Sequence, residues 1–70
     1  MKREELIQLL EESAANSLAT ARQLEEDAGY CDRVGRAAEA DGSRESAARA
    51  RFSAGCSVAT VNHLKGVSPE

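Results

Sequence analysis

Residues 7–38 decide the fold, and they read IQLLEESAANSLATARQLEEDAGYCDRVGRAA. With Ile7 at heptad position a, no charged residue falls on positions a and d of this stretch. The a positions are Ile7, Ala14, Ala21, Ala28 and Gly35, and the d positions are Leu10, Ser17, Leu24, Cys31 and Ala38. Such a stripe along one face is typical of a long packed helix. Because the stripe keeps its phase across Gly29, we predict one helix over about residues 2–40, with a break near Gly29 as the alternative.

Asp41, Gly42 and Ser43 are the clearest helix-breaking signal in the chain. Gly42 can adopt the left-handed conformation that ends a helix, and Ser43 can cap the next one. A second helix is predicted over about residues 44–65, with Glu45 in its first turn paired to Arg49. Gly66 is expected to cap its end, and residues 67–70 are expected to form a loose tail. The whole chain, residues 1–70, is thus predicted to be one all-α domain, a long helical hairpin.

The predicted second helix carries two apolar stripes. The first continues the packing pattern and consists of Ala47, Ala50, Ala54, Ser57, Val61 and Leu64. The second lies on the opposite side and consists of Ala48, Phe52, Cys56 and Ala59, with Gly55 between the two stripes. A surface helix usually has one apolar stripe. Two stripes indicate two different neighbours.

The predicted helix lengths favour a dimer. At 1.5 Å per residue, the helices would be roughly 58 Å and 33 Å long, so the start of the first helix would lack a partner from its own chain. Each large aliphatic side chain left in water forfeits on the order of 1.5–3 kcal/mol. We therefore predict a homodimer that forms a four-helix bundle. Its interface is expected to include Leu6, Ile7, Leu9, Leu10, Leu18, Phe52, Gly55, Cys56 and Ala59.

Composition supports a helical protein without a membrane segment. The 70 residues are 41% hydrophobic, but only Tyr30 and Phe52 are aromatic, so a core must be built from Leu, Val and Ala. The apolar cluster after the charged start is too short for a secretory signal or a membrane span. We expect a cytoplasmic protein with no membrane partner.

No pattern for catalysis or for cofactor or metal binding stands out. The single histidine, His63, and the two cysteines lack the close spacing of structural zinc ligands. Adjacent glutamates such as Glu11 and Glu12 resemble a solvated helix face more than a cleft that tunes two pKa values. We predict a protein that is not an enzyme and has no small-molecule substrate.

Arginines and the two aromatic residues are the candidate binding residues. Five arginines gather around the predicted turn, namely Arg33, Arg36, Arg44, Arg49 and Arg51. They could bind RNA, DNA or an acidic protein surface, or form local pairs such as Asp32–Arg36 and Glu45–Arg49. Aromatic residues and arginines are enriched where protein interfaces bind most tightly. The predicted partner-binding residues are Tyr30, Arg33, Arg36, Arg49 and Phe52, although Phe52 could instead fill the dimer core.

Two resemblances follow from the hairpin around Asp41, Gly42 and Ser43. Its layout resembles the Rop-type plasmid regulators, which are dimeric helical hairpins that bind paired RNA loops. Its size, its Ala/Arg/Glu-rich composition and its lack of catalytic groups resemble small phage-encoded inhibitors of bacterial host proteins. Those of the anti-quorum-sensing type block a host transcription regulator. The second resemblance implies a dimeric inhibitor that covers a larger bacterial protein, such as a DNA-binding transcription regulator. A nucleic-acid-binding hairpin and a structural or assembly subunit are the alternatives.

Overall fold

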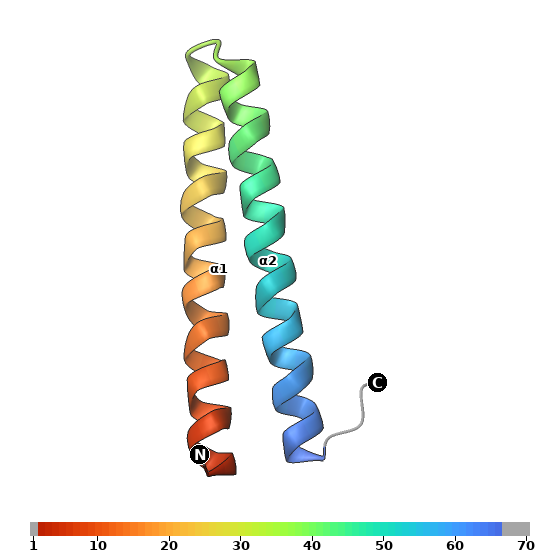
Figure 1. Cartoon of the computed structure of the whole chain (residues 1–70). Helices are drawn as coiled ribbons and strands as arrows, with labels where there is room; N and C mark the ends of the chain where they lie inside the picture. Colours follow the sequence, from red (N-terminus) through yellow and green to blue (C-terminus); the bar gives the residue numbers. More distant parts are fainter. Residues whose placement is uncertain (1, 67–70) are drawn as a thin grey trace.

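The computed structural model describes residues 2–66 and is a hairpin of two α-helices (Figure 1). Helix α1 spans Arg3–Arg33 and helix α2 spans Ala37–Lys65. Within residues 2–66 there is no strand, so the prediction of an all-α hairpin is confirmed. The predicted tail at residues 67–70 lies outside the described residues.

The turn lies at residues 34–36 and not at Asp41, Gly42 and Ser43, so the predicted helix bounds of 2–40 and 44–65 are wrong. Gly35 has the left-handed φ of 79° and donates its backbone N–H to Asp32 O at 3.2 Å. The N–H of Arg36 reaches back to Cys31 O at 2.7 Å, which closes the end of α1. The alternative break near Gly29 is also wrong, because Gly29 lies inside α1.

Burial of Ala40 explains why α2 continues through Gly42. Ala40 is 0% exposed, and its burial requires a helix that already runs alongside α1 before residue 41. A glycine inside a helix is less favourable than alanine by only about 1 kcal/mol. Packing therefore overrides the local signal, and Glu39 takes the place in the first turn of α2 that was predicted for Glu45. The predicted cap at the other end is confirmed, since Gly66 has a φ of 75° and donates to His63 O at 3.1 Å.

The core between the helices consists almost entirely of alanine. The buried residues are Ala14, Ala21 and Ala28 on α1, and Ala40, Ala47, Ala54 and Val61 on α2. Within each helix they are seven residues apart. Half-buried residues at the neighbouring d positions are Leu10, Ser17, Leu24 and Cys31 on α1, and Ser43, Ala50, Ser57 and Leu64 on α2. The predicted packing stripes are thus confirmed, except at Gly35 and Ala38, which are exposed at the turn and in the first turn of α2.

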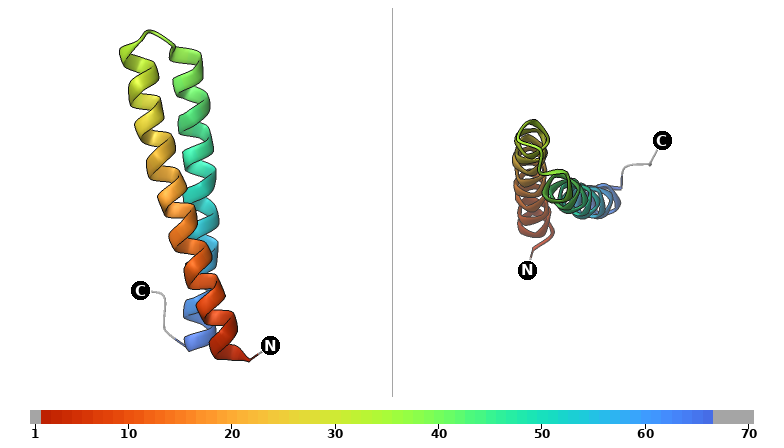
Figure 2. Two further views of the ribbon diagram at one scale, coloured as in Figure 1. Left: turned by 90° about the vertical axis from the view of Figure 1, so that its left-hand side faces the viewer. Right: turned by 90° about the horizontal axis from the view of Figure 1, so that it is seen from above.

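Three ion pairs between the helices define their register. Glu11 pairs with Lys65, Glu25 with Arg51 and Asp32 with Arg44, so the two residue numbers of each pair add up to 76. The helices lie closest beside the turn and move apart toward the free ends, and their axes are inclined to each other (Figures 1 and 2). Side-chain size follows the same gradient, from alanine layers near the turn to Leu10, Val61 and Leu64 near the free ends.

The predicted overhang of α1 does not exist. The helices contain 31 and 29 residues, about 46 Å and 43 Å at 1.5 Å per residue, so α2 runs beside nearly all of α1. Ile7, Leu10 and Leu18 are half-buried, whereas Leu6 and Leu9 remain 36% and 51% exposed. A dimer therefore cannot be argued from unequal helix lengths.

Within the described residues, neither helix has a stretch long and apolar enough to cross a membrane.

Substituting alanine at the two glycines tests the position of the turn. Gly35→Ala should lower the free energy of unfolding by about 1–2 kcal/mol, because the left-handed conformation is unfavourable for a residue with a Cβ atom. Gly42→Ala should raise it by about 0.5–1 kcal/mol, because a Cβ atom there meets nothing within 4 Å and alanine favours the helix. Urea unfolding followed by circular dichroism measures both. A stabilising Gly35→Ala together with a destabilising Gly42→Ala would place the turn at Gly42.

Candidate protein-binding surface

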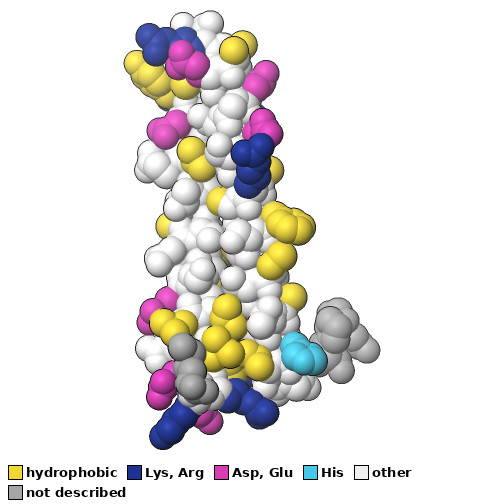
Figure 3. Space-filling model, viewed as in Figure 1, with side chains coloured by type: hydrophobic (Ala, Val, Ile, Leu, Met, Phe, Trp, Pro, Cys, Tyr) yellow, Lys and Arg dark blue, Asp and Glu magenta, His cyan; other side chains and the backbone are white. Residues whose placement is uncertain are grey.

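The two open faces of the hairpin differ in chemistry. One carries the three interhelical ion pairs, and we call it the ion-pair face. The other, seen in Figure 3, we call the serine-rich face. The serine-rich face is formed by Ser13, Asn16, Ser17 and Thr20 of α1 and by Ser46, Ala50, Ser53, Ser57 and Thr60 of α2. Heptad spacing gives this division, because the ion-pairing residues of α1 occupy position e, whereas Ser13 and Thr20 occupy position g on the other side of the packing stripe.

On the ion-pair face, opposite charges meet across the helix contact at heptad intervals. Arg51 holds Glu25 with two hydrogen bonds, from Nη2 to Oε1 at 2.5 Å and from Nε to Oε2 at 3.2 Å. Lys65 Nζ lies 3.2 Å from Glu11 Oε2. Nearer the turn, Arg44 binds Asp32 across the contact and lies 3.5 Å from Asp41 on its own helix.

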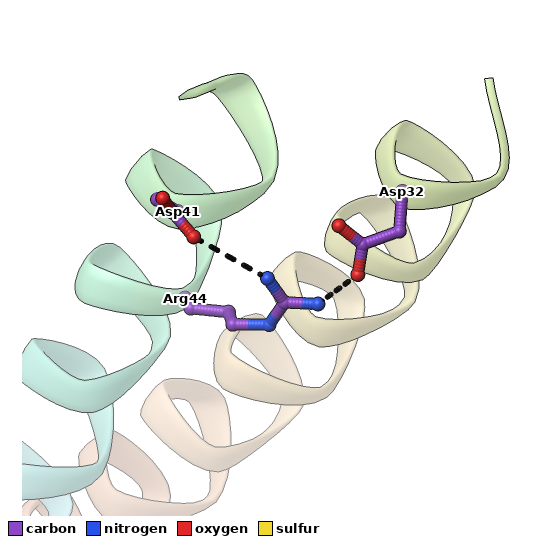
Figure 4. A network of polar contacts seen from close by, with 3 residues as sticks. All are labelled: Asp32, Asp41 and Arg44. Carbon is purple, nitrogen blue, oxygen red and sulfur yellow. Dashed lines mark hydrogen bonds and ion pairs between the residues drawn. The ribbon is translucent and has the colours of Figure 1, made fainter. Parts of the chain in front are cut away.

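Figure 4 shows the Arg44 pair at close range, with α2 on the left and α1 on the right. This order is the reverse of that in Figure 1, so the pair lies on the face opposite to the one in Figure 3. The same register places Leu18 opposite Val58, which gives the row one apolar position between two ion pairs.

The ion pairs shift the protonation equilibria of their members. The hydrogen bond from Arg51 lowers the pKa of Glu25 below its ordinary value, and the same bond raises the pKa of Arg51. The hydrogen bond to Asp32 raises the pKa of Arg44. All of these groups are exposed, and exposed ion pairs contribute little stability in water. Their main effect is to favour one register of the two helices.

Most arginines of the predicted basic patch are engaged by carboxylates. Arg49 Nη2 lies 2.6 Å from Glu45 Oε1, which confirms the predicted pair. The predicted pair between Asp32 and Arg36 is wrong, because α1 ends at Arg33 and the two residues no longer lie on one helix. Arg36 instead lies 3.5 Å from Glu39. Of the five arginines, only Arg33 forms no ion pair within residues 2–66.

Both aromatic side chains project into solvent, but on different helices. Phe52 is 76% exposed and Tyr30 is 57% exposed. Tyr30 shares its heptad position with Leu9 and Asn16 at the outer edge of α1, whereas Phe52 lies on the outer side of α2. The five predicted partner-binding residues therefore do not form one continuous surface.

The second apolar stripe of α2 is left uncovered by the hairpin. All its members are exposed, and with the glycine beside them they form what we call the α2 outer stripe: Ala48, Phe52, Gly55, Cys56 and Ala59. Val58, beside this stripe, is 47% exposed. Helix α1 thus covers the first of the two stripes, and the second neighbour indicated by the sequence stays a prediction.

An open groove of about 430 Å³ runs along the serine-rich face. It is lined by Leu9, Glu12, Ser13, Asn16, Ser17, Thr20 and Ala50. This groove was not predicted from the sequence. A signal was present, since Ser17 and Ala50 occupy d positions where a packed bundle usually carries a larger apolar residue.

Cys31 is half-buried, Cys56 is exposed, and both thiols are free. Among residues 2–66, no three His, Cys, Asp or Glu side chains gather in a way that could hold a metal ion.

No protein-family model, no curated protein and no solved structure matches the chain. The properties of its own surface are therefore the basis for a functional proposal.

The Glu25–Arg51 pair should contribute to the acid dependence of stability. Because the pKa of Glu25 is lowered from 4.5 on folding, the stability linked to it is present above that pH and is lost as the pH falls through the lower value. The melting temperature of Glu25→Gln should therefore fall less than that of wild type when the pH is lowered from about 6 to about 3. Glu26→Gln is the control, because Glu26 forms no ion pair within residues 2–66. An equal fall in melting temperature for Glu25→Gln and Glu26→Gln would contradict the pair between Glu25 and Arg51.

Proposed function

We propose that the chain is a non-enzymatic protein-binding module that inhibits or modulates a larger protein by covering part of its surface. It acts as a dimer of hairpins in a four-helix bundle. The observation that carries the proposal is the 76% exposure of Phe52, at the centre of the α2 outer stripe. A large aromatic ring on a rigid helix is a common anchor of tight protein interfaces.

The neighbours of Phe52 suit close contact with another protein. Ala48, Gly55 and Ala59 have small side chains or none, so a partner can approach the α2 backbone on both sides of the ring. Val58 extends the apolar area toward the ion-pair face. Apolar contact at the centre with arginines at the edge, here Arg49 and Arg51, matches the usual composition of interfaces.

The rigidity of the hairpin favours inhibition by occlusion. Phe52 lies inside a helix of 29 residues, so binding needs no ordering of a loop. Preorganised surfaces lose less entropy on docking, which allows a small protein to bind tightly. The resemblance to phage-encoded inhibitors makes a bacterial DNA-binding transcription regulator the first class of target to test.

The nucleic-acid-binding alternative receives less support from the ion pairs. Arg36, Arg44, Arg49 and Arg51 each face a carboxylate of the same chain, and those carboxylates would also repel phosphates. The salt dependence of binding separates the two functions. The affinity of a protein that contacts phosphates falls steeply with salt, whereas a contact anchored by Phe52 responds less.

Replacement of Phe52 tests the proposal. Phe52→Ala should change the free energy of unfolding by no more than about 0.5 kcal/mol, because the ring is mostly in solvent. It should nevertheless abolish capture of the partner from the native cell, as measured by affinity purification with quantitative mass spectrometry. Gln23→Ala, an exposed position on α1, is the matched control and should retain the partner.

Parallel capture with Tyr30→Ala shows whether the other exposed aromatic residue contributes. A partner retained equally by wild type and Phe52→Ala would rule out the α2 outer stripe as the binding surface.

A further inference from the structure

The hairpin exposes more surface than its mass predicts. Its accessible surface is 5153 Å², whereas a compact monomer of 7.5 kDa is expected to expose roughly 4250 Å². The difference of about 900 Å² is close to the ~800 Å² that each partner buries in a protein interface of standard size. The isolated chain thus has about the surplus area that one stable contact would remove.

The serine-rich face carries little charge along its groove. The groove residues are Ser, Thr, Asn, Ala and Leu9, with Glu12 at the outer edge, and Asp27 continues the row of Ser13 and Thr20 nearer the turn. On the opposite face, Glu11, Glu25 and Asp32 hold their cationic partners in solvent. Burial of ion pairs carries a large desolvation penalty. A close contact is therefore far more favourable on the serine-rich face.

Leucines supply the apolar area of this same face. Leu10, Leu24 and Leu64 are half-buried at d positions, and Leu9 is 51% exposed on the wall of the groove. Figure 3 shows hydrophobic atoms gathered over both helices toward the free ends of this face. A second hairpin can complete their burial, as the d layers of four-helix bundles do.

Groove and leucines on one surface make it self-complementary. Ser17 and Ala50 leave space in the groove, and leucines lie beside it on the same face. A contact between identical copies about a two-fold axis requires both features on one patch. Small side chains at the contact also allow helices to approach closely, as in the alanine layers within the hairpin.

We infer that a second copy of this chain docks on the serine-rich face, so that its leucines pack into the groove and the two hairpins form the four-helix bundle. This inference rests on the dimer in the proposed function and specifies its interface. This interface includes the residues near the free ends of the helices that were predicted from the sequence, such as Leu9 and Leu10. It leaves Phe52 and the rest of the α2 outer stripe outside, free for a different protein.

Sedimentation equilibrium across a concentration series, with helicity followed by circular dichroism, tests the inference. Wild type should have a mass of about 15 kDa, twice that of one chain. Thr20→Arg on α1 and Ser53→Arg on α2 both place a charge on the serine-rich face at positions exposed in the hairpin. Each should raise the concentration at which half the protein is dissociated by at least tenfold.

Ala15→Arg is the matched control, because Ala15 is also exposed but lies on the ion-pair side of α1. It should leave the dissociation midpoint unchanged, and so should Phe52→Ala. A wild-type chain that is monomeric and fully helical would overturn the inference. The inference would also be overturned if Ala15→Arg dissociated the dimer while Thr20→Arg or Ser53→Arg remained dimeric. Partner capture through Phe52 and the mass of the protein in solution are separate measurements. Failure of the proposed partner binding can therefore be distinguished from failure of the proposed dimer.

Discussion

Alanine at every seventh position is the constraint from which the rest of the structure follows. In the register of the ion pairs, Ala21 lies opposite Ala54 and Ala28 opposite Ala47, while Ala14 lies opposite Val61 and Ala40 packs beside the turn. All of these residues are at most 6% exposed. Such small side chains permit two helices to lie close together, but each contributes little apolar area. The hairpin is thus closely packed and yet has a thin core, and protein domains of this size are only marginally stable on a single core.

A thin core has consequences for the surface. The larger apolar side chains, including Leu9, Phe52 and Val58, cannot enter the alanine layers and remain 47% exposed or more. They are distributed over two sides of the molecule, Leu9 beside the groove and Phe52 on the outer side of α2. The ion pairs on the face opposite the groove define the register and keep that face charged. One hairpin thereby offers two different apolar surfaces, which suits a protein that binds both its own copy and another protein.

The packing stripes could be predicted from the sequence, but the turn could not be placed by local signals. Asp41, Gly42 and Ser43 form a stronger local breaking pattern than Val34, Gly35 and Arg36, and the run of small residues between them fits either helix. Burial of Ala40 decides between the two, and burial is a property of the assembled hairpin. One non-local signal was available. A turn at Gly35 gives helices of nearly equal length and brings acidic residues of α1 opposite basic residues of α2, as Glu25 and Arg51 show. The exposure of Phe52 followed from its stripe, whereas the groove and the contrast between faces required the register.

Disulfide trapping measures that register most directly. In a background in which Cys31 and Cys56 are replaced by serine, Leu18→Cys combined with Val58→Cys should oxidise readily to a bridge within one chain. The register that pairs Glu25 with Arg51 sets these two positions opposite each other. Leu18→Cys combined with Lys65→Cys should not form that bridge, since the two positions lie two helical turns out of register. Mass spectrometry of the non-reduced chain distinguishes a bridge within one chain from one between two. Ready oxidation of the 18/65 pair and not of the 18/58 pair would contradict the alanine-layered hairpin with its turn at Gly35.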